Sequence, residues 1–404
     1  MYDNIKSIDK FDFSNKRVIM RCDFNVPIDK KTGEITSCKR IEAALPSIKK
    51  ILESADQLIL MSHLGKPKKL VEKNQDFKSQ LSLSIVANKL KSLLGQEIVL
   101  AKDYLENELP KGKIILLENV RFHYDLEQSK SDEQRDIFAK RLSSFGDIFI
   151  NDAFGTCHRK EASVYDIVKY LPSGIGYLVA KEIKMLSAIL ENPEKPYYAI
   201  LGGAKVEDKI KVIESLATKV DGIIIIGAME YSFMKAMGKN IGNSLCEGLD
   251  TAKKSLASNY KDKLIFAKDT VVAKREDDNF VDIKTVVAGA IPDDYIGFDI
   301  GDETIKLIEE KVSNAQTIFW NGPAGMFEVN PFEKGTYAIA KIIANSNCKC
   351  VVGGGDSVTA IEKSGIPEEK FTHLSTGGGA SMEFIESNGR LPALDIQEEK
   401  NAGN

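Results

Sequence analysis

Short apolar runs rich in β-branched residues recur along the chain, and each is followed at once by small, polar or glycine residues. Longer stretches with apolar residues at helical spacing, such as 79–94 and 207–220, separate these runs. Strands that alternate with helices predict an α/β fold with parallel sheets, and continuously apolar strands are typical of sheets covered on both faces. The predicted strands are 17–21, 58–62, 113–117 and 147–151 in the first half, and 197–201, 222–226, 263–267, 316–320 and 349–352 in the second.

A helix followed by two prolines divides the chain near its middle. Apolar residues recur at spacings of three and four over 181–190, and the prolines within 191–196 end the helix. A length of 404 residues suits two or three domains at about 150 residues each. We therefore predict an N-terminal α/β domain at 1–180, a hinge helix and linker at 181–196, a C-terminal α/β domain at 197–385 and a tail at 386–404.

Composition excludes several classes of protein. Hydrophobic residues make up 43% and charged residues 28%, as in folded soluble proteins, and the net charge of −4 argues against a broadly basic nucleic-acid surface. No apolar run approaches the ~18 residues of a membrane span, and the first residues lack the apolar segment of a secretory signal. The six scattered cysteines have no CxxC or zinc spacing, so we expect reduced thiols and a cytoplasmic location.

Polar and cationic side chains follow the predicted strands of the first half. Ligands of open α/β sheets bind beyond the carboxyl ends of the strands, so these side chains are the first candidates for a site. Any one of these cations alone could form a surface salt bridge, but their shared position favours a small ligand with phosphate and carboxylate groups. Asp23 and Asn25 could bind ligand hydroxyls or cap a turn. The cations are Arg21, Arg40, His63, Lys66, Arg121, His158 and Arg159.

Glycine-rich segments follow the predicted strands of the second half. Glycine lets the backbone approach a phosphate closely, and amides at a helix start can hold an anion. One such loop is weak evidence because turns and caps also need glycine, but several in one half indicate a nucleotide. The P-loop pattern is absent, as is a GxGxxG that opens the first βαβ unit. The segments are 202–205, 227–228, 321–325, 353–357 and 376–381.

Four residues of this half have two open interpretations each. Asp356 could bind Mg²⁺ or cap a helix. Lys205 and Lys209 would share a helix face and could hold an anion between them or be solvated. Glu328 could bind a nucleotide ribose or be a loop carboxylate. Other chemistries lack their signatures: GxSxG and HExxH are absent, and the four histidines have no metal-ligand spacing.

Eight segments of the chain resemble the signature blocks of the phosphoglycerate kinase family, in that family's order and over nearly the whole length. The resemblance implies two Rossmann-like domains with parallel sheets, joined by a helical hinge, and a C-terminal tail that returns to the N-terminal domain. The segments are 21–27, 62–67, 118–122, 151–159, 201–210, 320–328, 353–357 and 375–381.

The resemblance also implies which residues bind each ligand. For 3-phosphoglycerate or 1,3-bisphosphoglycerate on the N-terminal domain, they are Asp23, Asn25, Arg40, His63, Lys66, Arg121 and Arg159. For MgATP or MgADP on the C-terminal domain, they are Lys205, Lys209, Gly297, Glu328, Gly354, Gly355, Asp356 and Ser357, with Asp356 as the ligand of Mg²⁺. Gly377, Gly378 and Gly379 would offer backbone amides to the transferring group.

Two departures from the family pattern bear on these sites. Lys66 stands where the family usually has arginine, so a point charge replaces a forked donor. The segment 226–230 reads Ile-Gly-Ala-Met-Glu where the family usually has Gly-Gly-Gly-Met-Ala near the adenine. Glu230 therefore adds a carboxylate, and we expect a changed adenine pocket.

The implied reaction is reversible phosphoryl transfer between an acyl phosphate and ADP. The acceptor of the reverse reaction is an ionised carboxylate, so no general base is needed, and catalysis reduces to positioning and charge stabilisation. Arg40 and Lys205 are expected to be the nearest cations, with Lys209 and the Gly378 amide assisting, as the domains close about the hinge. We expect a monomer with no nucleic-acid or membrane partner. The alternatives are a kinase for another small carboxylate and a non-catalytic binding protein.

Overall fold

The computed structural model describes residues 1–29, 31–73, 75–277 and 279–403, and its elements sort into two units. One unit comprises Met1–Lys184 together with the chain from Arg390, and the other comprises Met185–Gly389. The chain passes between the units twice, inside helix α7 (Tyr177–Leu190) and after Gly389. The predicted limits differ from these by a few residues, and the hinge stays a prediction.

Helix α7 begins four residues before the predicted start at 181. The backbone N–H of Tyr177 donates to Ser47 Oγ at 2.9 Å, and Asp152 Oδ1 accepts from the next two backbone N–H groups, those of Leu178 and Val179. These side chains satisfy the first amides of the helix, which otherwise lack partners. Both come from distant parts of the sequence, so local periodicity could not reveal this start.

The N-terminal sheet has six parallel strands in the order β3-β4-β2-β1-β5-β6. All four strands predicted for this half are confirmed to within one residue, whereas the two outer strands are only three residues long and were not predicted. The strands are β1 (Arg17–Cys22), β2 (Gln57–Met61), β3 (Val99–Ala101), β4 (Ile114–Leu117), β5 (Ile148–Asp152) and β6 (Ser173–Ile175).

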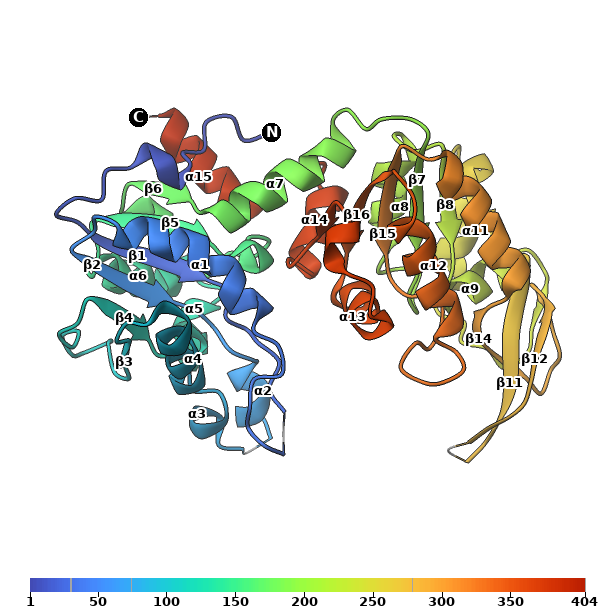
Figure 1. Cartoon of the computed structure of the whole chain (residues 1–404), viewed down its shortest axis with the longest axis horizontal. Helices are drawn as coiled ribbons and strands as arrows, with labels where there is room; N and C mark the ends of the chain where they lie inside the picture. Colours follow the sequence, from blue (N-terminus) through green and yellow to red (C-terminus); the bar gives the residue numbers. More distant parts are fainter. Residues whose placement is uncertain (30, 74, 278, 404) are drawn as a thin grey trace. The chain divides into compact units, whose positions relative to one another are not determined.

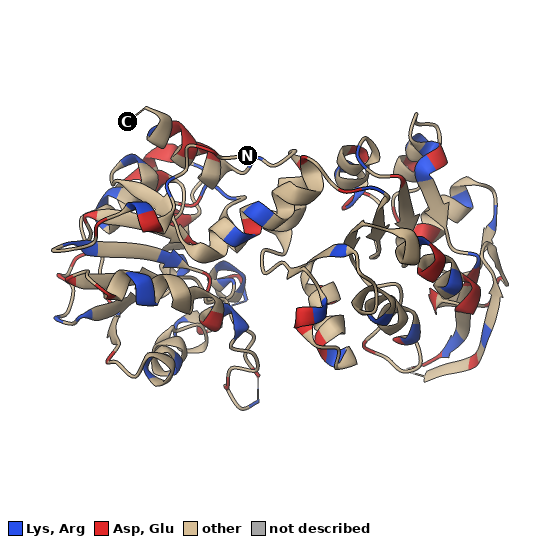
Figure 2. Ribbon diagram, turned by 45° about the horizontal axis from the view of Figure 1, so that its top comes forward, with Lys and Arg blue, Asp and Glu red and all other residues tan. Residues whose placement is uncertain are grey.

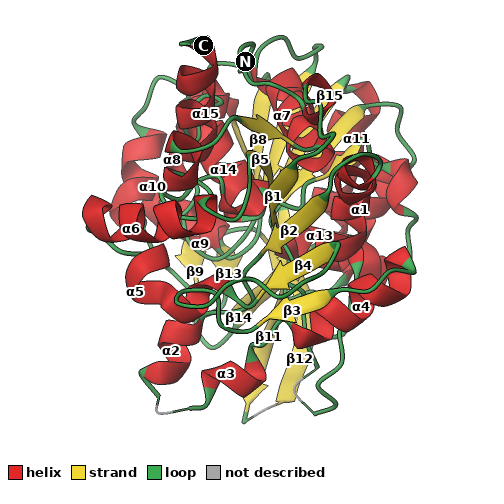
Figure 3. Ribbon diagram, turned by 90° about the vertical axis from the view of Figure 1, so that its left-hand side faces the viewer, coloured by secondary structure: helices red, strands yellow, loops and turns green. Residues whose placement is uncertain are grey.

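Helices cover both faces of this sheet (Figure 3). Val18 and Met20 of β1 point to a core shared with α1 (Lys39–Leu52) and α4 (Ser84–Leu94). Ile19 points to the opposite core, which includes residues of α6 (Asp132–Ser143). Alternate strand residues thus enter two cores, which explains the continuous apolar pattern. The other helices of this unit are α2 (Pro67–Val71), α3 (Phe77–Gln80), α5 (Tyr124–Glu127), α6 (Asp132–Ser143) and α15 (Pro392–Ala402).

The helix predicted over 79–94 is wrong as a single element. The structure has α3 and α4 with a break between them. Glu118 explains the break, because its carboxylate accepts hydrogen bonds from Ser82 Oγ and from the backbone N–H of Leu83, both at 2.7 Å. A carboxylate from a distant strand end therefore replaces the helical hydrogen bonds at this point.

The C-terminal segment forms helix α15, which lies beside β6 in the N-terminal unit (Figure 1). Gln397 Nε2 donates to the carbonyl of Gly174 at 3.0 Å, and Tyr2 Oη donates to Asp395 at 2.9 Å. Tyr2 also accepts from the backbone N–H of Leu391. The two ends of the chain therefore fold together.

The second unit is built on another six-stranded parallel sheet, in the order β10-β8-β7-β15-β16-β17. All five strands predicted for this half are confirmed. The strands are β7 (Tyr197–Leu201), β8 (Gly222–Ile225), β10 (Leu264–Phe266), β15 (Thr317–Asn321), β16 (Lys349–Gly353) and β17 (His373–Leu374). The helices are α8 (Ile210–Ala217), α9 (Met229–Ala236), α10 (Leu249–Leu256), α11 (Asp302–Asn314), α12 (Lys334–Ala344), α13 (Gly355–Ser364) and α14 (Gly379–Glu386).

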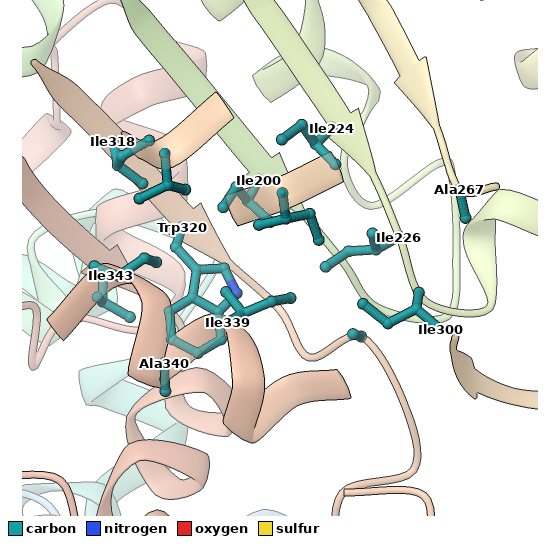
Figure 4. Packing of buried hydrophobic residues seen from close by; sticks show 14 of the residues in the cluster. Ile200, Ile224, Ile226, Ala267, Ile300, Ile318, Trp320, Ile339, Ala340 and Ile343 are labelled. Carbon is teal, nitrogen blue, oxygen red and sulfur yellow. The ribbon is translucent and has the colours of Figure 1, made fainter. Parts of the chain in front are cut away.

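Trp320 lies at the centre of the core on one face of this sheet. Its side chain is fully buried and packs with Ile200 of β7 and with Ile339 and Ala340 of α12 (Figure 4). The indole Nε1 donates to the carbonyl of Gly322 at 2.9 Å. The core thus fixes the loop that follows β15, where functional residues are expected.

A three-stranded antiparallel sheet of this unit was not predicted. Most residues of its outer strand are exposed or half-exposed, so the strand lacks the apolar run that marks the parallel strands. The strands are β11 (Asp269–Glu276), β12 (Asn279–Val287) and β14 (Ile296–Ile300), and a further pair is formed by β9 (Asn240–Ile241) and β13 (Ala290–Ile291).

Charged residues lie mainly on helices and loops, while the strands of the two parallel sheets are mostly uncharged (Figure 2). Among the helices that the structure describes, none is both long and apolar enough to cross a membrane.

Candidate functional site

The polar residues predicted for the first ligand follow the carboxyl ends of β1, β2, β4 and β5 or start α1. Neighbouring strands pair in parallel, with Arg21 of β1 opposite Met61 of β2 and Asn151 of β5. The residues after these strands therefore meet at one edge of the sheet. Six of the seven predicted residues take part in one hydrogen-bonded cluster or lie beside it, and the exception is Lys66.

Arg40 stands in the first turn of α1 and pairs with Asp23. Its guanidinium donates to Asp23 Oδ2, while Asp23 Oδ1 accepts from the backbone N–H of Asn25 at 3.2 Å. Asn25 Oδ1 in turn accepts from the backbone N–H of Gly65 at 2.8 Å. Arg40 is 32% exposed, so its guanidinium is positioned by Asp23 and still reaches solvent.

A buried carboxylate, Glu161, gathers the other arginines. Its Oε1 accepts from Arg121 at 2.9 Å, from Gln128 at 2.6 Å and from Arg159 at 3.4 Å. Burial raises the pKa of Glu161, but the charges of Arg121 and Arg21 outweigh this and leave the pKa below its ordinary value. Glu161 therefore stays ionised. It was not among the predicted residues, and its only local signal is a position two residues after Arg159.

His63 is buried at the centre of this cluster. Its Nδ1 lies 3.2 Å from the guanidinium of Arg21, which is fully buried. Burial and the charges of Arg121, Arg21, Arg159 and Arg40 hold the pKa of His63 well below its ordinary value. The imidazole is therefore neutral at physiological pH.

Lys66 differs from the other predicted residues. It precedes α2 and lines a separate cavity of about 820 Å³ together with Lys69 and Lys73. Its ammonium is a flexible point charge on an exposed side chain, which has no fixed direction toward the arginines. The structure brings its neighbour Gly65, whose carbonyl accepts from Arg121 at 3.2 Å, into the cluster instead.

In the second unit, three of the predicted glycines are required by loop packing. A Cβ at Gly202 would lie 2.2 Å from the carbonyl oxygen of Pro323, and one at Gly322 would lie 2.3 Å from the carbonyl oxygen of Gly202. A Cβ at Gly227 would lie 2.7 Å from the backbone nitrogen of Gly203. The loops after β7, β8 and β15 thus pack backbone against backbone, which only glycine permits.

Two other glycines start helices and face open space. Gly355 begins α13 and Gly378 precedes α14, and a Cβ at either would meet nothing within 4 Å. Gly378 has φ of 50°, so a side chain there would be disfavoured by the backbone alone. The first amides of α13 and α14 are placed to bind an anion.

The two predicted lysines have different environments. Lys205 is half-exposed, and its Nζ lies 2.6 Å from the carboxylate of Glu247. Lys209 is largely buried at the start of α8 and donates to Asn321 Oδ1, and burial lowers its pKa. Both lie after β7, at the carboxyl edge of this sheet. The prediction that they share a helix face is wrong, because α8 begins only at Ile210 and Lys205 lies in the loop before it.

Asp356 lies in the first turn of α13, where its carboxylate is exposed. The alternative that it caps the helix is wrong, because Gly354 is the N-cap residue. The described residues include no group of three or more histidine, cysteine or acidic side chains that could hold a metal. A single carboxylate fits Mg²⁺ that is bound mainly by phosphate oxygens and water.

The remaining three predicted residues have structural surroundings of different kinds. Ser357 is fully buried, and its Oγ accepts from the backbone N–H of Gly322 at 2.7 Å. Gly297 lies in β14, where a Cβ would approach the hydroxyl of Tyr231 to 2.3 Å. Glu328 is exposed on the loop between β15 and α12. Ser357 therefore holds a loop with its side chain, and only its backbone N–H stands at the helix start.

Glu230, the unexpected carboxylate, lies in the core and not on a ligand-facing surface. It is 2% exposed in α9, and its Oε1 accepts from the backbone N–H of Ala267 at 2.7 Å. Burial raises the pKa of Glu230 to about 8. Its role in the structure is thus to satisfy the amide that follows β10.

Replacing Glu230 by glutamine is expected to stabilise the protein at alkaline pH. The pKa of Glu230 rises on folding from its ordinary value of 4.5 to about 8. The stability that Glu230 contributes is therefore fully present below pH 4.5 and is lost as the pH rises through 8. The free energy of unfolding of the variant should equal that of the parent at pH 4.5. At pH 8 it should be larger by a few kcal/mol, because each pH unit of the shift corresponds to ~1.4 kcal/mol.

Urea unfolding at both pH values measures this difference. Glutamine keeps an acceptor for the Ala267 amide, so the two proteins differ only in the ionisable group. The matched control is Glu309→Gln at an exposed position of α11. The free energy of unfolding of this control should depend on pH as that of the parent does. Parallel pH profiles for Glu230→Gln and the parent would show that Glu230 does not titrate in this range.

Three comparisons with known proteins agree with this arrangement. The family model described as phosphoglycerate kinase matches residues 8–388. The phosphoglycerate kinase of Finegoldia magna is 45% identical over 98% of this chain and 100% of the relative, and that of Fusobacterium nucleatum is 45% identical over 94% and 96%. A structure of phosphoglycerate kinase from Coxiella burnetii matches with a TM-score of 0.84 at 36% identity, covering 98% of this chain and 99% of that one. This chain therefore belongs to the phosphoglycerate kinase family.

Proposed function

We propose that this kinase transfers a phosphoryl group reversibly between 1,3-bisphosphoglycerate and MgADP, giving 3-phosphoglycerate and MgATP. The observation that carries the proposal is the arginine cluster around Glu161 and His63 at the carboxyl edge of the first sheet. Three arginines whose charge is only partly balanced by one buried carboxylate suit a small ligand with a phosphate and a carboxylate group. Family membership supports the same substrates.

In the N-terminal unit, we assign the phosphate and carboxylate groups of the substrate to His63, Arg121 and Arg159. Asp23 and Asn25 would meet the hydroxyl group, and Lys66 would turn from its cavity to add a further charge. Arg40 would face the end of the substrate that reacts. The support is that Arg40 is held by Asp23 yet reaches solvent, so its charge is available to a ligand.

In the C-terminal unit, we assign the nucleotide phosphates to Lys205, Lys209 and the amides at the start of α13, which include those of Gly354, Gly355 and Ser357. Gly297 and Glu328 would contact the nucleoside. Asp356 would bind Mg²⁺, which would neutralise part of the phosphate charge when bound. The support is the set of helix starts and cations at one sheet edge.

The chemical step needs no general base. A carboxylate oxygen of 3-phosphoglycerate attacks the γ-phosphorus of ATP, and the new oxygen–phosphorus bond forms as the bond to the β–γ bridging oxygen breaks. The electron pair leaves with ADP, and the reverse reaction retraces this path. Arg40, Lys205 and Lys209 would stabilise the charge of the moving group, with the amide of Gly378 assisting.

Direct transfer requires the two ligands to meet. We therefore infer that the units approach during turnover and that α7, which contributes residues to both units, takes part in this motion. Exclusion of water on closure would protect the acyl phosphate from hydrolysis. One chain carries both sets of residues, which supports catalysis by a monomer, and the six unpaired cysteines support a cytoplasmic location.

A coupled assay tests the proposed function. Purified protein with MgATP and 3-phosphoglycerate should produce 1,3-bisphosphoglycerate, which glyceraldehyde-3-phosphate dehydrogenase consumes with oxidation of NADH. The same assay with other small carboxylates in place of 3-phosphoglycerate should give no turnover. Folded protein that binds nucleotide but turns over none of these substrates would overturn the proposal.

A further inference from the structure

Arg21 directs its guanidinium at His63 from the end of β1. It is fully buried and uses all three of its nitrogens. Nε donates to Ser163 Oγ at 2.8 Å, one terminal nitrogen donates to the carbonyl of Cys22 at 2.5 Å, and the other lies 3.2 Å from His63 Nδ1. A guanidinium has five donors and no acceptor.

This geometry determines where the imidazole carries its proton. Because Arg21 can only donate, Nδ1 of His63 must accept, and the proton of the neutral ring then lies on Nε2. We propose that Arg21 is a positioning residue that fixes His63 as the Nε2–H tautomer, so that His63 offers substrate a neutral N–H donor and not a cation. The part about substrate rests on the proposed function, whereas the tautomer does not.

Two buried carboxylates hold Arg21 in this direction. Glu127 of α5 accepts from the backbone N–H of Ser163 at 2.9 Å and shares a hydrogen bond with its hydroxyl at 2.5 Å. Burial raises the pKa of Glu127 to about 8, so either group can carry the hydrogen of that bond. The oxygen of Ser163 accepts from Arg21 Nε because a guanidinium can only donate. Glu161 Oε2 lies 4.0 Å from the same guanidinium and adds a charge attraction. Arg21 is thus the donor toward both Ser163 and His63.

The charges around His63 agree with a neutral ring. Arg21, Arg40, Arg121 and Arg159 all act on it, and burial adds to their effect, so its pKa lies well below the ordinary value. The carboxylates of this cluster already pair with the arginines: Asp23 with Arg40, and Glu161 with Arg121 and Arg159. A neutral donor contributes a directed hydrogen bond to an anionic oxygen without adding a fifth repelling cation.

His158 provides an internal control with the opposite geometry. Its Nε2 lies 3.1 Å from Arg159 Nε, which donates, while its buried Nδ1 has no hydrogen-bond partner among the described residues. Because Nε2 of His158 accepts from Arg159, the proton of the neutral ring lies on Nδ1. Two histidines in one cluster should show opposite tautomers.

Nuclear magnetic resonance of the free protein, labelled with ¹⁵N in histidine, tests the tautomer. The chain has only four histidines, and the signal of His63 is identified by its loss in His63→Gln. At pH 7, His63 should show the correlation pattern of the Nε2–H tautomer and His158 that of the Nδ1–H tautomer. A His63 ring that is protonated on both nitrogens, protonated on Nδ1, or averaged between tautomers would overturn the proposal. No turnover is required, so this result is independent of the proposed function.

Variants of Arg21 test the positioning role. Arg21→Lys keeps a cationic donor and should keep the Nε2–H pattern, whereas Arg21→Met should give a mixture of tautomers at His63 and leave His158 unchanged. If Arg21→Met does not fold, Ser163→Ala should loosen Arg21 while keeping its charge, and should also give a mixture. An unchanged His63 pattern in the folded variants would show that Arg21 does not fix the ring.

The role toward substrate is tested with amide replacements of His63. The amide nitrogen of glutamine can stand near the place of Nε2, and that of asparagine near the place of Nδ1. His63→Gln should keep KM for 3-phosphoglycerate within a few-fold of the parent, while His63→Asn and His63→Ala should raise it about tenfold, as for one lost hydrogen bond. Equal KM values for the glutamine and asparagine variants would overturn this role, and the tautomer would still stand on the resonance data.

Discussion

Replacing Arg40 by alanine is expected to lower kcat by about a thousandfold or more and to raise KM for 3-phosphoglycerate only a few-fold. Arg40 is 32% exposed and is held only at Asp23 among the ion pairs described above, whereas Arg21 and Arg121 are buried and the partly exposed Arg159 pairs with Glu161. The charge of Arg40 is therefore assigned to the moving phosphoryl group, where stabilisation matters most in the transition state. Steady-state kinetics in the coupled assay separates kcat from KM.

The chain offers a matched control for this variant. Arg17 stands at the opposite end of β1 and pairs with Asp147 at 2.8 Å, as Arg40 pairs with Asp23. Arg17→Ala removes a comparable arginine–aspartate pair and should leave kcat within about twofold, because exposed pairs contribute little stability. The kcat of Arg40→Lys should lie between that of the parent and that of Arg40→Ala. A folded Arg40→Ala enzyme with the kcat of the parent would remove Arg40 from the catalytic residues.

The sequence predicts the parallel sheets well because burial on both faces leaves a strong local signal. The runs at 18–20 and 197–201 are apolar throughout, and both lie in buried strands that have one exposed or half-exposed residue each. Residues directly after such strands meet at one edge by topology alone, so the candidate cations could be located without coordinates. The exposed strand β12 has no such run, so the antiparallel sheet left no comparable signal.

The partners of the predicted residues were much harder to infer. Glu161 and Glu127 hold the arginines, yet each is one carboxylate among many, and only tertiary structure shows that both are buried. The predicted glycines also divide into two roles. Gly202 and Gly322 serve the packing of neighbouring loops, and Gly355 and Gly378 leave room for a ligand. A pattern of glycines after strands cannot separate these roles because both require the absence of a Cβ.

Replacing Asp356 by asparagine is expected to raise the Mg²⁺ concentration needed for half-maximal activity by about tenfold or more, since one charged ligand is lost. The side chains have the same shape, and asparagine is a weaker ligand for a hard cation. Asp356 belongs to no group of three or more histidine, cysteine or acidic side chains in the part of the chain that the structure describes, so its loss leaves no ready-made set of metal ligands. Activity measured against Mg²⁺ at fixed ATP, with saturating 3-phosphoglycerate, gives this value.

Loss of a negative charge near the start of a helix can also change the stability of that helix, without any effect on metal binding. The control variant must therefore lose the same charge at the start of a different helix. Asp302 begins α11, is exposed and pairs with Lys334, which makes Asp302→Asn a comparable loss in the first turn of another helix. Asp302→Asn should change the free energy of unfolding slightly, and its activity should require the same Mg²⁺ concentration as that of the parent. If Asp356→Asn also kept that dependence, the metal would be bound by the nucleotide phosphates and water alone, and Asp356 would only stabilise the start of α13.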